Sequence, residues 1–289
     1  MKKVAFIKRS NGSHWVGDGF PVKNIFSYTD IAEKISPFLM MDHAGPAVFP
    51  PTKQKLGVGQ HPHRGFETVT IVYQGGVTHR DSAGGGGSIG PGDVQWMTAA
   101  SGLIHEEFHS EDFARQGGPF EMIQLWVNLP AKDKMSAPGY QGITAENIVH
   151  VSLANDAGTA RIIAGAFGNV KGAAQTFTPM NVWDLRLNAG RTLSLTLPSG
   201  HTAALYVLSG RLTVGTQTVG AAEMVVMERE GTELLAEVTE DAVVLLLSGA
   251  PLNESIVGHG PFVMNTRAEI MQAMQDYNNG KFGQIVSAS

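Results

Sequence analysis

The sequence predicts an all-β protein, built from two small β-barrels in tandem and ending in a short helix. Glycine is abundant, at 35 residues, and most glycines separate short apolar runs, as turns separate short strands. The second half of the chain also repeats the pattern of the first. Residues 206–214 resemble residues 71–79, and residues 223–227 resemble residues 93–97. A duplicated small barrel accounts for both observations.

The composition is that of a globular protein and excludes several functional classes. Of the 289 residues, 43% are hydrophobic and 16% are charged, which leaves enough apolar material for two cores. The formal net charge of -5 lacks the basic character expected of direct contact with nucleic acid or an anionic membrane. Cysteine is absent, so disulfides, thiolate catalysis and cysteine-ligated zinc are excluded.

The sequence shows no targeting features. The longest apolar run, residues 242–247, is far too short to span a bilayer. The basic residues near the N-terminus are not followed by the apolar stretch of a signal peptide. We therefore expect a cytoplasmic protein, with the nucleus as a further compartment if the source is eukaryotic.

A change in composition marks the predicted division between the barrels. From Pro130 to about Glu146 the chain is rich in Lys, Asp, Ser, Pro and Gly, as inter-domain connections often are. We predict an N-terminal barrel at residues 1–132, a linker at residues 133–147 and a C-terminal barrel at residues 148–289.

Short runs rich in β-branched and aromatic residues predict the strands of the first barrel. They are residues 4–7, 25–28, 38–41, 67–73, 77–81, 94–97, 103–108 and 121–129. Residues 42–46 are predicted to form a turn, and Gly75-Gly76 to close a hairpin. The glycine run at residues 84–87 is predicted to be a hairpin loop, because the Gly-Lys-Ser/Thr of a phosphate-binding loop does not follow it.

One helix is predicted near the C-terminus. Thr266 and Glu269 have the spacing of a capping box, and residues 278–280, Asn-Asn-Gly, supply a stop signal. The apolar residues Ile270, Met274 and Tyr277 recur at helical spacing. We expect the helix to pack through them on the outside of a barrel.

Two short motifs carry the chemistry. His61 and His63 lie two positions apart, and so do His105 and Glu107. Residues i and i+2 of a strand point to the same face, so each pair can converge on one point, and two adjacent strands can share that point. Strand alternation selects Glu107 over Glu106 as the partner of His105. The sequence therefore predicts a metal site of three imidazoles and one carboxylate.

Other metal-capable residues leave alternatives open. An isolated His-x-His is a weak signal, but here a β-type run, glycine turns and a second pair follow it. Glu67 comes four residues after His63 and is expected on the same face, as a ligand, as a group that orients a histidine or as a base. His79 and His109 fit exposed or hydrogen-bonded core histidines better than residues of the site.

The ligand types restrict the metal. Three neutral imidazoles and a carboxylate without sulfur suit one divalent ion: Fe(II), Mn(II), Ni(II), Cu(II) or Zn(II). Held on two adjacent strands, the four ligands leave coordination positions for dioxygen and a chelating substrate, as in non-haem iron oxygenases. A closed structural zinc site fits less well.

The second half of the chain repeats the strand pattern without the ligands. When the halves are aligned on their glycine turns, the four ligand positions fall on Thr196, Pro198, Leu235 and Glu237. We therefore predict that the barrel at residues 1–132 binds metal and that the barrel at residues 148–289 does not.

These motifs resemble those of a known family. The runs HPHRGFETV at residues 61–69, PGDVQWMTA at 91–99, QLWVNLP at 124–130 and HGPFVMNT at 259–266 are similar to those of pirins, and the resemblance covers nearly the whole chain. Pirins belong to the cupin superfamily and are bicupins, so the resemblance implies two jelly-roll barrels with iron, as Fe(II), in the first. Matched residue by residue, it places the family's ligands on His61, His63, His105 and Glu107. General cupins would instead use Glu67.

The resemblance also implies a function. Pirins are associated with quercetin 2,3-dioxygenase activity, which cleaves a flavonol with O2 and releases carbon monoxide; Glu107 is the expected catalytic base. The alternative is a non-enzymatic, redox-sensitive iron protein that binds a transcription factor or a metabolic enzyme. A third, weaker option is another cupin chemistry, such as isomerisation or decarboxylation.

Overall fold

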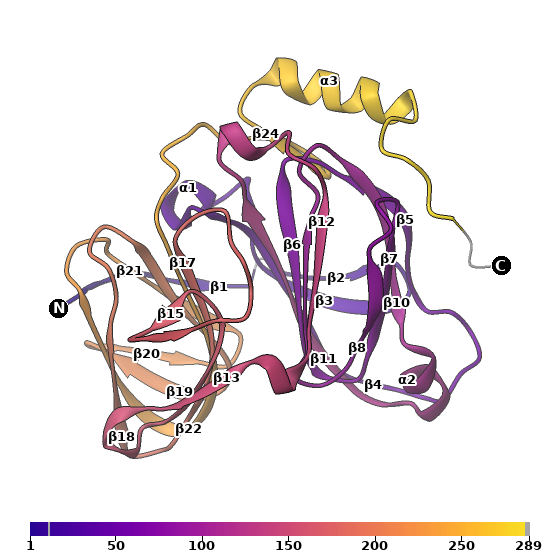
Figure 1. Ribbon diagram of the computed structural model, residues 1–289. Coiled ribbons are helices and arrows are strands. Elements are labelled where there is room, and N and C mark those ends of the chain that lie inside the picture. Colours follow the sequence, from indigo (N-terminus) through magenta and orange to yellow (C-terminus); the bar gives the residue numbers. More distant parts are fainter. Residues whose placement is uncertain (11, 287–289) are drawn as a thin grey trace. The chain divides into compact units, whose positions relative to one another are not determined.

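The computed structural model describes residues 1–10 and 12–286, and most of its regular structure is β-strand (Figure 1). Its contacts divide the chain into two compact units. Unit 1 comprises Met1–Asn11, Glu33–Pro37 and Glu146–Leu252; unit 2 comprises Gly12–Ala32, Phe38–Ala145 and Asn253–Ser289. The all-β prediction is confirmed. No helix in the described part of the chain has the length and apolarity needed to cross a membrane.

Each unit contains a segment from the far end of the chain. Strand β1 (Val4–Arg9) belongs to unit 1, where it pairs with β21 (Glu223–Met227). Helix α3 (Arg267–Asn278) belongs to unit 2. The predicted limits place β1 in the N-terminal barrel, residues 1–132, and α3 in the C-terminal barrel, residues 148–289. In the structure each belongs to the opposite unit. Composition and spacing indicate where strands occur, but not which distant strand will pair with them.

In the described part of the chain, unit 2 contains two large sheets and the two-stranded sheet β23-β24. One has four strands in the order β5-β10-β7-β8, and the other has seven in the order β12-β9-β6-β11-β4-β3-β2. The strands are β2 (Gly12–Val16), β3 (Phe20–Phe26), β4 (Phe38–Phe49), β5 (Gly57–His63), β6 (Phe66–Gln74), β7 (Val77–Asp81), β8 (Gly86–Ile89), β9 (Val94–Thr98), β10 (Leu103–His109), β11 (Gly118–Asn128), β12 (Gly139–Ile143), β23 (Val257–His259) and β24 (Phe262–Met264). Two short helices are α2 (Glu111–Gln116) and the 3-10 turn Ala131–Asp133.

The inward-facing residues of unit 2 change character along the strands. A buried cluster of Phe20, Val22, Val72, Phe120 and Met122 forms an apolar core. Further along the same inward faces of β6 and β11, the side chains are polar. A polar barrel interior costs stability unless its groups are paired, so this layer indicates a site rather than a core.

Unit 1 contains a nine-stranded sheet in the order β1-β21-β19-β22-β17-β14-β13, with β18 on β22 and β20 on β19, and the two-stranded sheet β15-β16. Its other elements are β13 (Val149–Ser152), a 3-10 turn (Ala154–Asp156), β14 (Gly158–Ala164), β15 (Ala166–Phe167), β16 (Val170–Lys171), β17 (Met180–Leu187), β18 (Arg191–Thr196), β19 (Thr202–Val214), β20 (Gln217–Gly220) and β22 (Glu233–Gly249). Helix α1 (Ala32–Ile35) and the 3-10 turn Ala145–Asn147 lie where the chain passes from one unit to the other. The buried core of unit 1 is apolar, with side chains such as Leu193, Leu195, Leu234 and Ala236.

The glycines used to align the two halves have the same conformation. Gly75 and Gly210 adopt φ values of 83° and 82°, in the left-handed region that favours glycine. This agreement supports the predicted duplication.

The predicted turn at residues 42–46 is wrong. Strand β4 continues through it from Phe38 to Phe49. Gly45 has a φ of 85°, and the register with β11 shifts between Phe120 and Met122. Such a β-bulge bends a strand without ending it. Gly45 and Pro46, which suggest a turn in the sequence, mark a bend instead.

The segment predicted as a linker, residues 133–147, contains part of unit 2. Strand β12 (Gly139–Ile143) pairs with β9, and Lys134 is buried. The Lys134 ammonium group donates hydrogen bonds to the carbonyl oxygens of Gly65 and Val263 and to Asn128 Oδ1, at 2.6 to 2.9 Å. Burial lowers the pKa of Lys134 to about 7. The lysine of the segment 133–147 is therefore a buried, hydrogen-bonded residue of unit 2 and not part of a solvated connection.

Helix α3 begins and ends as predicted. The Thr266 hydroxyl accepts a hydrogen bond from the backbone N–H of Glu269, and Asn279 caps the C-terminus. Ile270 is buried as expected, but Tyr277 is 38% exposed, and Ala273 and Asp276 are the other buried residues. The helix packs on unit 2 in a cluster that includes Ile104 of β10.

Candidate metal centre

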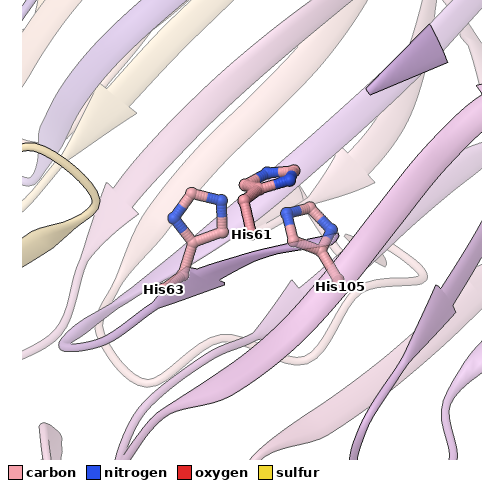
Figure 2. Close-up of side chains that lie close together, drawn as sticks. All are labelled: His61, His63 and His105. Atoms are coloured by element: carbon pink, nitrogen blue, oxygen red, sulfur yellow. The ribbon is translucent and has the colours of Figure 1, made fainter. Parts of the chain in front are cut away.

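The two predicted motifs lie on neighbouring antiparallel strands. In the pairing of β5 with β10, His105 is directly opposite His61, and Leu103 is opposite His63. His61 and His63 share one face of β5, so all three imidazoles meet on that face. Figure 2 shows the three rings turned toward a common point.

The three imidazoles are close enough to bind one ion. One ligand nitrogen from each of His61, His63 and His105 lies within 4.8 Å of the others. The ring centroids are 4.1 Å apart for His61 and His105, 4.7 Å for His63 and His105, and 4.9 Å for His61 and His63. His63 Nδ1 and His105 Nε2 are buried and have no hydrogen-bond partner among the described residues. Buried polar atoms without partners are rare and costly, so this pair fits metal ligation.

Burial keeps His63 and His105 in the neutral form that metals require. Burial, and then the neighbouring imidazoles, hold the pKa of both His63 and His105 well below the usual value. The ring of His61 is oriented by its backbone: Nδ1 donates to the carbonyl oxygen of Gly59 at 2.8 Å, which leaves Nε2 as the acceptor.

Glu107 lies beside this cluster but is not part of the group formed by His61, His63 and His105. Its carboxylate is within 4.8 Å of ligand nitrogens of His105 and His79, which form a second metal-capable group. The two groups share His105, so they describe one metal region and not two separate centres. Glu107 Oε1 accepts hydrogen bonds from Gln95 Nε2 at 3.1 Å and from the Thr70 hydroxyl at 3.3 Å.

Glu106 points to the other side of β10. Its carboxylate pairs with Arg80 and, at 3.3 Å, with Lys55, whose side chain is 57% exposed. These ion pairs lower the pKa of Glu106 against the opposing effect of burial. The structure thus separates the adjacent carboxylates as strand alternation requires.

His79 and Asp81 belong to the site, although the sequence favoured a plain core role for His79. His79 Nδ1 lies 3.3 Å from His105 Nδ1, and His79 Nε2 lies 3.1 Å from Asp81 Oδ2. Burial raises the pKa of Asp81, but the hydrogen bonds from His79 and Gly85 outweigh it and bring the pKa below its usual value. The signal that could have revealed them is their spacing, two positions apart, as in both ligand motifs.

His109, by contrast, is a core histidine. It packs among Phe20, Phe49, Phe113 and Phe120, with ring centroids 4.6 to 5.6 Å away. Its Nε2 lies 2.8 Å from the carbonyl oxygen of Gly19. The predicted core role of His109 is confirmed.

The expectation that Glu67 shares a face with His63 is wrong. Glu67 pairs with Thr98 and accepts its hydroxyl hydrogen bond at 2.8 Å, whereas Thr70, three positions on, contacts Glu107. Residues three apart on a strand face opposite sides. The chain turns at Gly65, with a φ of 93°, between β5 and β6, so alternation does not carry across from His63. Burial raises the pKa of Glu67 to about 7.

Both metal-capable groups found among residues 1–10 and 12–286 lie in unit 2. In unit 1, Thr196, Pro198 and Glu237 are exposed and Leu235 is partly buried. The residues that fill the core of that unit are their neighbours, including Leu195, Leu197 and Ala236. The aligned positions are therefore one residue out of phase with the interior, and the interior itself is apolar.

Aromatic side chains flank one side of the cluster. The Trp126 ring lies 5.2 Å from His63 and stacks on Phe66 at 4.3 Å, and Tyr28 stacks on Trp126 at 6.4 Å. A flat apolar surface therefore adjoins the imidazoles.

Comparison with known proteins agrees with the motifs. The Pirin family profile matches residues 19–127, and the profile of the Pirin C-terminal cupin domain matches residues 182–283. A Pseudomonas aeruginosa protein named "Putative quercetin 2,3-dioxygenase PA2418" is 56% identical over 282 residues, which cover 98% of this chain and 99% of that protein. The chain belongs to the pirin family. The predicted pair of cupin barrels is confirmed.

Other relatives of this pirin include a solved structure. The crystal structure of quercetin 2,3-dioxygenase from Acinetobacter baumannii has a TM-score of 0.96 and 53% identity, over 99% of this chain and 100% of that one. The human protein named Pirin is 35% identical over 260 residues, which cover 87% of this chain and 84% of that protein. The likeness thus spans both cupin domains.

Proposed function

We propose that this pirin is a metal-dependent dioxygenase that cleaves a flavonol such as quercetin with O2. The observation that carries the proposal is the convergence of His61, His63 and His105 with two buried nitrogens that lack a partner. The names of the relatives at 56% and 53% identity support the choice of reaction.

We assign His61, His63, His105 and Glu107 as the ligands of one divalent ion. Nitrogen and carboxylate ligands without sulfur fit Fe(II), which we propose, and also Ni(II), Mn(II), Cu(II) and Zn(II). Both hydrogen bonds to Glu107 fall on Oε1, which leaves Oε2 for the site. When bound, the ion would supply Lewis acidity and open positions where a flavonol oxygen and dioxygen can meet.

Glu107 is also the proposed catalytic base. Gln95 and Thr70 fix the orientation of its carboxylate, and the Tyr140 hydroxyl donates to Gln95 Oε1 at 3.3 Å. In this role the Glu107 carboxylate takes the proton of the flavonol 3-hydroxyl group, which makes the flavonol electron-rich toward O2. Cleavage of the ring by one O2 yields carbon monoxide and a depside.

The aromatic wall supports a flat substrate. Trp126 lies beside His63, and Phe66 and Tyr28 each stack against Trp126. Offset stacking of aromatic rings is favourable by about 0.5 to 1.5 kcal/mol beyond buried area. A flavonol oxygen at the histidines would leave the planar ring system alongside this surface.

Oxygen consumption tests the proposal. Protein loaded anaerobically with Fe(II) is mixed with quercetin and O2, and oxygen uptake and carbon monoxide are measured in parallel with the His61→Ala variant. We expect turnover by the wild type and its loss in the variant, which lacks a ligand. The same assay with the other four metals completes the test. Absence of turnover with every metal, or equal turnover in the variant, would contradict the proposal.

A further inference from the structure

Behind His105 lies a line of two further side chains on the neighbouring strand. β7 places His79 opposite Glu107 and Asp81 opposite His105. The Nδ1 atoms of His105 and His79 are 3.3 Å apart, and His79 Nε2 is 3.1 Å from Asp81 Oδ2. His79 and His105 are fully buried and Asp81 is 5% exposed, so solvent does not compete for these hydrogen bonds.

The direction of the line is set at Asp81. Asp81 Oδ1 accepts hydrogen bonds from the backbone N–H groups of Ala83 at 2.9 Å and Gly85 at 2.8 Å. Backbone N–H groups can only donate, so this oxygen is fully engaged as an acceptor, and Oδ2 faces His79. An ionised carboxylate can only accept, so the hydrogen of that bond belongs to His79 Nε2.

The direction of the hydrogen bond at Asp81 determines the proton positions on the rings of His79 and His105. A neutral imidazole carries one N–H, so a His79 that donates from Nε2 has a lone pair on Nδ1. That lone pair can only be satisfied by an N–H on His105 Nδ1. His105 then has its own lone pair on Nε2, which is the buried nitrogen without a hydrogen-bond partner. In Figure 2, one ring nitrogen of His105 points toward His61 and His63, and the other points away.

We propose that Asp81 and His79 are positioning residues that fix His105 in the tautomer whose Nε2 is free to bind the metal. The inference rests on the proposed metal site. Carboxylate or carbonyl groups behind metal-binding histidines commonly act in this way. Here the control passes through a second imidazole.

The loop after β7 is shaped for this arrangement. A Cβ on Gly85 would lie 2.4 Å from Asp81 Oδ2 and 2.7 Å from Tyr140 Cβ, closer than atoms can approach. Tyr140 in turn stacks on the His79 ring, with centroids 5.2 Å apart and planes 18° apart. Gly87, which lies in β8 after this loop, has room for a methyl group, with Tyr140 Oη 3.4 Å away. The glycine run at residues 84–87 therefore has a specific requirement at Gly85.

The first experiment reads the tautomer directly. Metal-free protein labelled with 15N in histidine is studied by NMR at pH 8, above the ordinary pKa of imidazole, and the His105 signals are assigned by their loss in His105→Gln. We expect His105 to carry its proton on Nδ1. A proton on Nε2 would overturn the proposal. Neither outcome depends on flavonol turnover, so failure of the proposed reaction is a separate result.

The second experiment measures Zn2+ affinity by competition with a chromophoric chelator. In Asp81→Asn, the amide oxygen remains with the two backbone N–H groups and the NH2 faces His79, which reverses every donor in the line and leaves a proton on His105 Nε2. We expect affinity to fall about 10- to 100-fold. In His79→Asn, the amide can present its oxygen to His105, so affinity stays closer to that of the wild type.

The double variant separates orientation from structure. The amide that His79→Asn introduces can turn its oxygen toward His105 whatever occupies position 81, so adding this substitution to Asp81→Asn should restore affinity. Gly85→Ala should weaken binding and Gly87→Ala should not. Glu121→Gln is the matched control, since Glu121 pairs with the buried His43 at 2.9 Å elsewhere in unit 2. Unchanged affinity in Asp81→Asn, or a double variant weaker than Asp81→Asn, would overturn the proposal.

Discussion

At the scale of single residues, the neighbours Glu106 and Glu107 show how strand alternation assigns different roles to the same chemical group. Glu106 forms ion pairs with Arg80 and Lys55 on the outer side of β10. Glu107 faces the interior, where Gln95 and Thr70 donate to it. The same substitution at the two positions therefore separates site chemistry from general effects of charge.

Glu107→Gln should remove a base and a metal ligand together, whereas Glu106→Gln should remove only the ion pairs with Arg80 and Lys55. General base catalysis contributes about 10²- to 10⁴-fold, so we expect a loss of at least that size in kcat for Glu107→Gln. Glu106→Gln should keep its turnover, because Glu106 lies on the opposite face of β10 from Glu107 and touches none of the proposed ligands. Oxygen consumption with quercetin measures both. Comparable losses in the two variants would contradict the assignment of Glu107.

Glu67 gives the fold a dependence on pH. Burial raises the pKa of Glu67 from 4.5 to about 7 in the folded protein, so the folded state holds this proton more tightly than the unfolded state. The stability that the protonated group contributes is complete below about pH 4.5 and is lost as the pH rises through about 7. Its full size is roughly 3 kcal/mol, at 1.36 kcal/mol for each pKa unit.

Glu67→Gln should abolish that dependence, because an amide stays neutral. We expect the midpoint of urea unfolding of the variant, relative to wild type, to rise steadily between pH 5 and pH 8. Glu106→Gln is the control, since the pKa of Glu106 is lowered and its titration falls below this range. A difference between Glu67→Gln and wild type that stays constant over the range would rule out Glu67 as the titrating group.

The residues of the site differ in how far the sequence reveals them. The histidine cluster follows from i, i+2 spacing alone, because spacing within one strand fixes the face. Glu67 was misplaced because a turn at Gly65 intervenes between β5 and β6. The contact of His79 with His105 could not be predicted, because the two residues lie 26 positions apart along the chain. They meet only through the pairing of β7 with β10, which the fold determines.

At the scale of elements, helix α3 is tied to the residue that follows the first ligand motif. Asp276 of α3 accepts a hydrogen bond from Arg64 at 2.9 Å, and both side chains are less than 10% exposed. Arg64 Nε donates to the carbonyl oxygen of Ser101 at 2.7 Å, two residues before Leu103 opens β10. Hydrogen bonds from Lys281, Arg64 and Gln272 hold the pKa of Asp276 well below its usual range.

Asp276→Ala should therefore destabilise unit 2 strongly. It leaves the Arg64 guanidinium buried without its partner, and breaking a buried pair costs about 3 to 5 kcal/mol. We expect the free energy of unfolding, from urea titration, to fall by this amount and Zn2+ affinity to fall with it. Asp112→Ala is the matched control, because Asp112 pairs with Arg115 on the surface. A loss below about 1 kcal/mol in Asp276→Ala, the size expected of an exposed pair, would show that α3 is not a structural tie.

Local signals predicted the elements that depend on local chemistry. The capping pair Thr266 and Glu269 located α3, and Gly75-Gly76 located the hairpin between β6 and β7. The linker prediction for residues 133–147 is wrong because it rests on polar composition. Composition does not distinguish a solvated Lys from a buried, fully hydrogen-bonded one such as Lys134.

At the scale of the whole molecule, both units have an apolar core, and unit 2 holds a metal-capable group beside it. The described metal-capable groups lie in unit 2, and the core of unit 1 is hydrophobic. A ligand that binds only the folded state stabilises the part of the structure that holds it. Metal should therefore stabilise the two units unequally.

Removal of metal by a chelator should weaken unit 2 selectively. At an ion concentration 100 times Kd, binding contributes about 2.7 kcal/mol. Hydrogen exchange read by mass spectrometry should show faster exchange in peptides from β5, β7 and β10 after chelation, with little change in β19 and β22. His105→Ala, which lacks a ligand, should exchange alike with and without chelator. Equal acceleration in both units would contradict a metal site confined to unit 2.

The duplication and the all-β architecture could be predicted because repeated turns and short apolar runs are properties of the sequence. The membership of β1 in unit 1 and of α3 in unit 2 could not be predicted in this way. Val4 pairs with Met227, a contact that depends on the packing energy of the completed sheet and leaves no local pattern.

That pairing has a consequence for biosynthesis. The strand Val4–Arg9 leaves the ribosome before its partner, which follows about 220 residues later. At about 5 to 20 residues per second, the strand waits roughly 10 to 45 s for that partner. Helix α3, which belongs to unit 2, is synthesised later still. The sheet of unit 1 therefore cannot be completed during translation until most of the protein has been made, whereas the barrel strands of unit 2 all lie within residues 12–143.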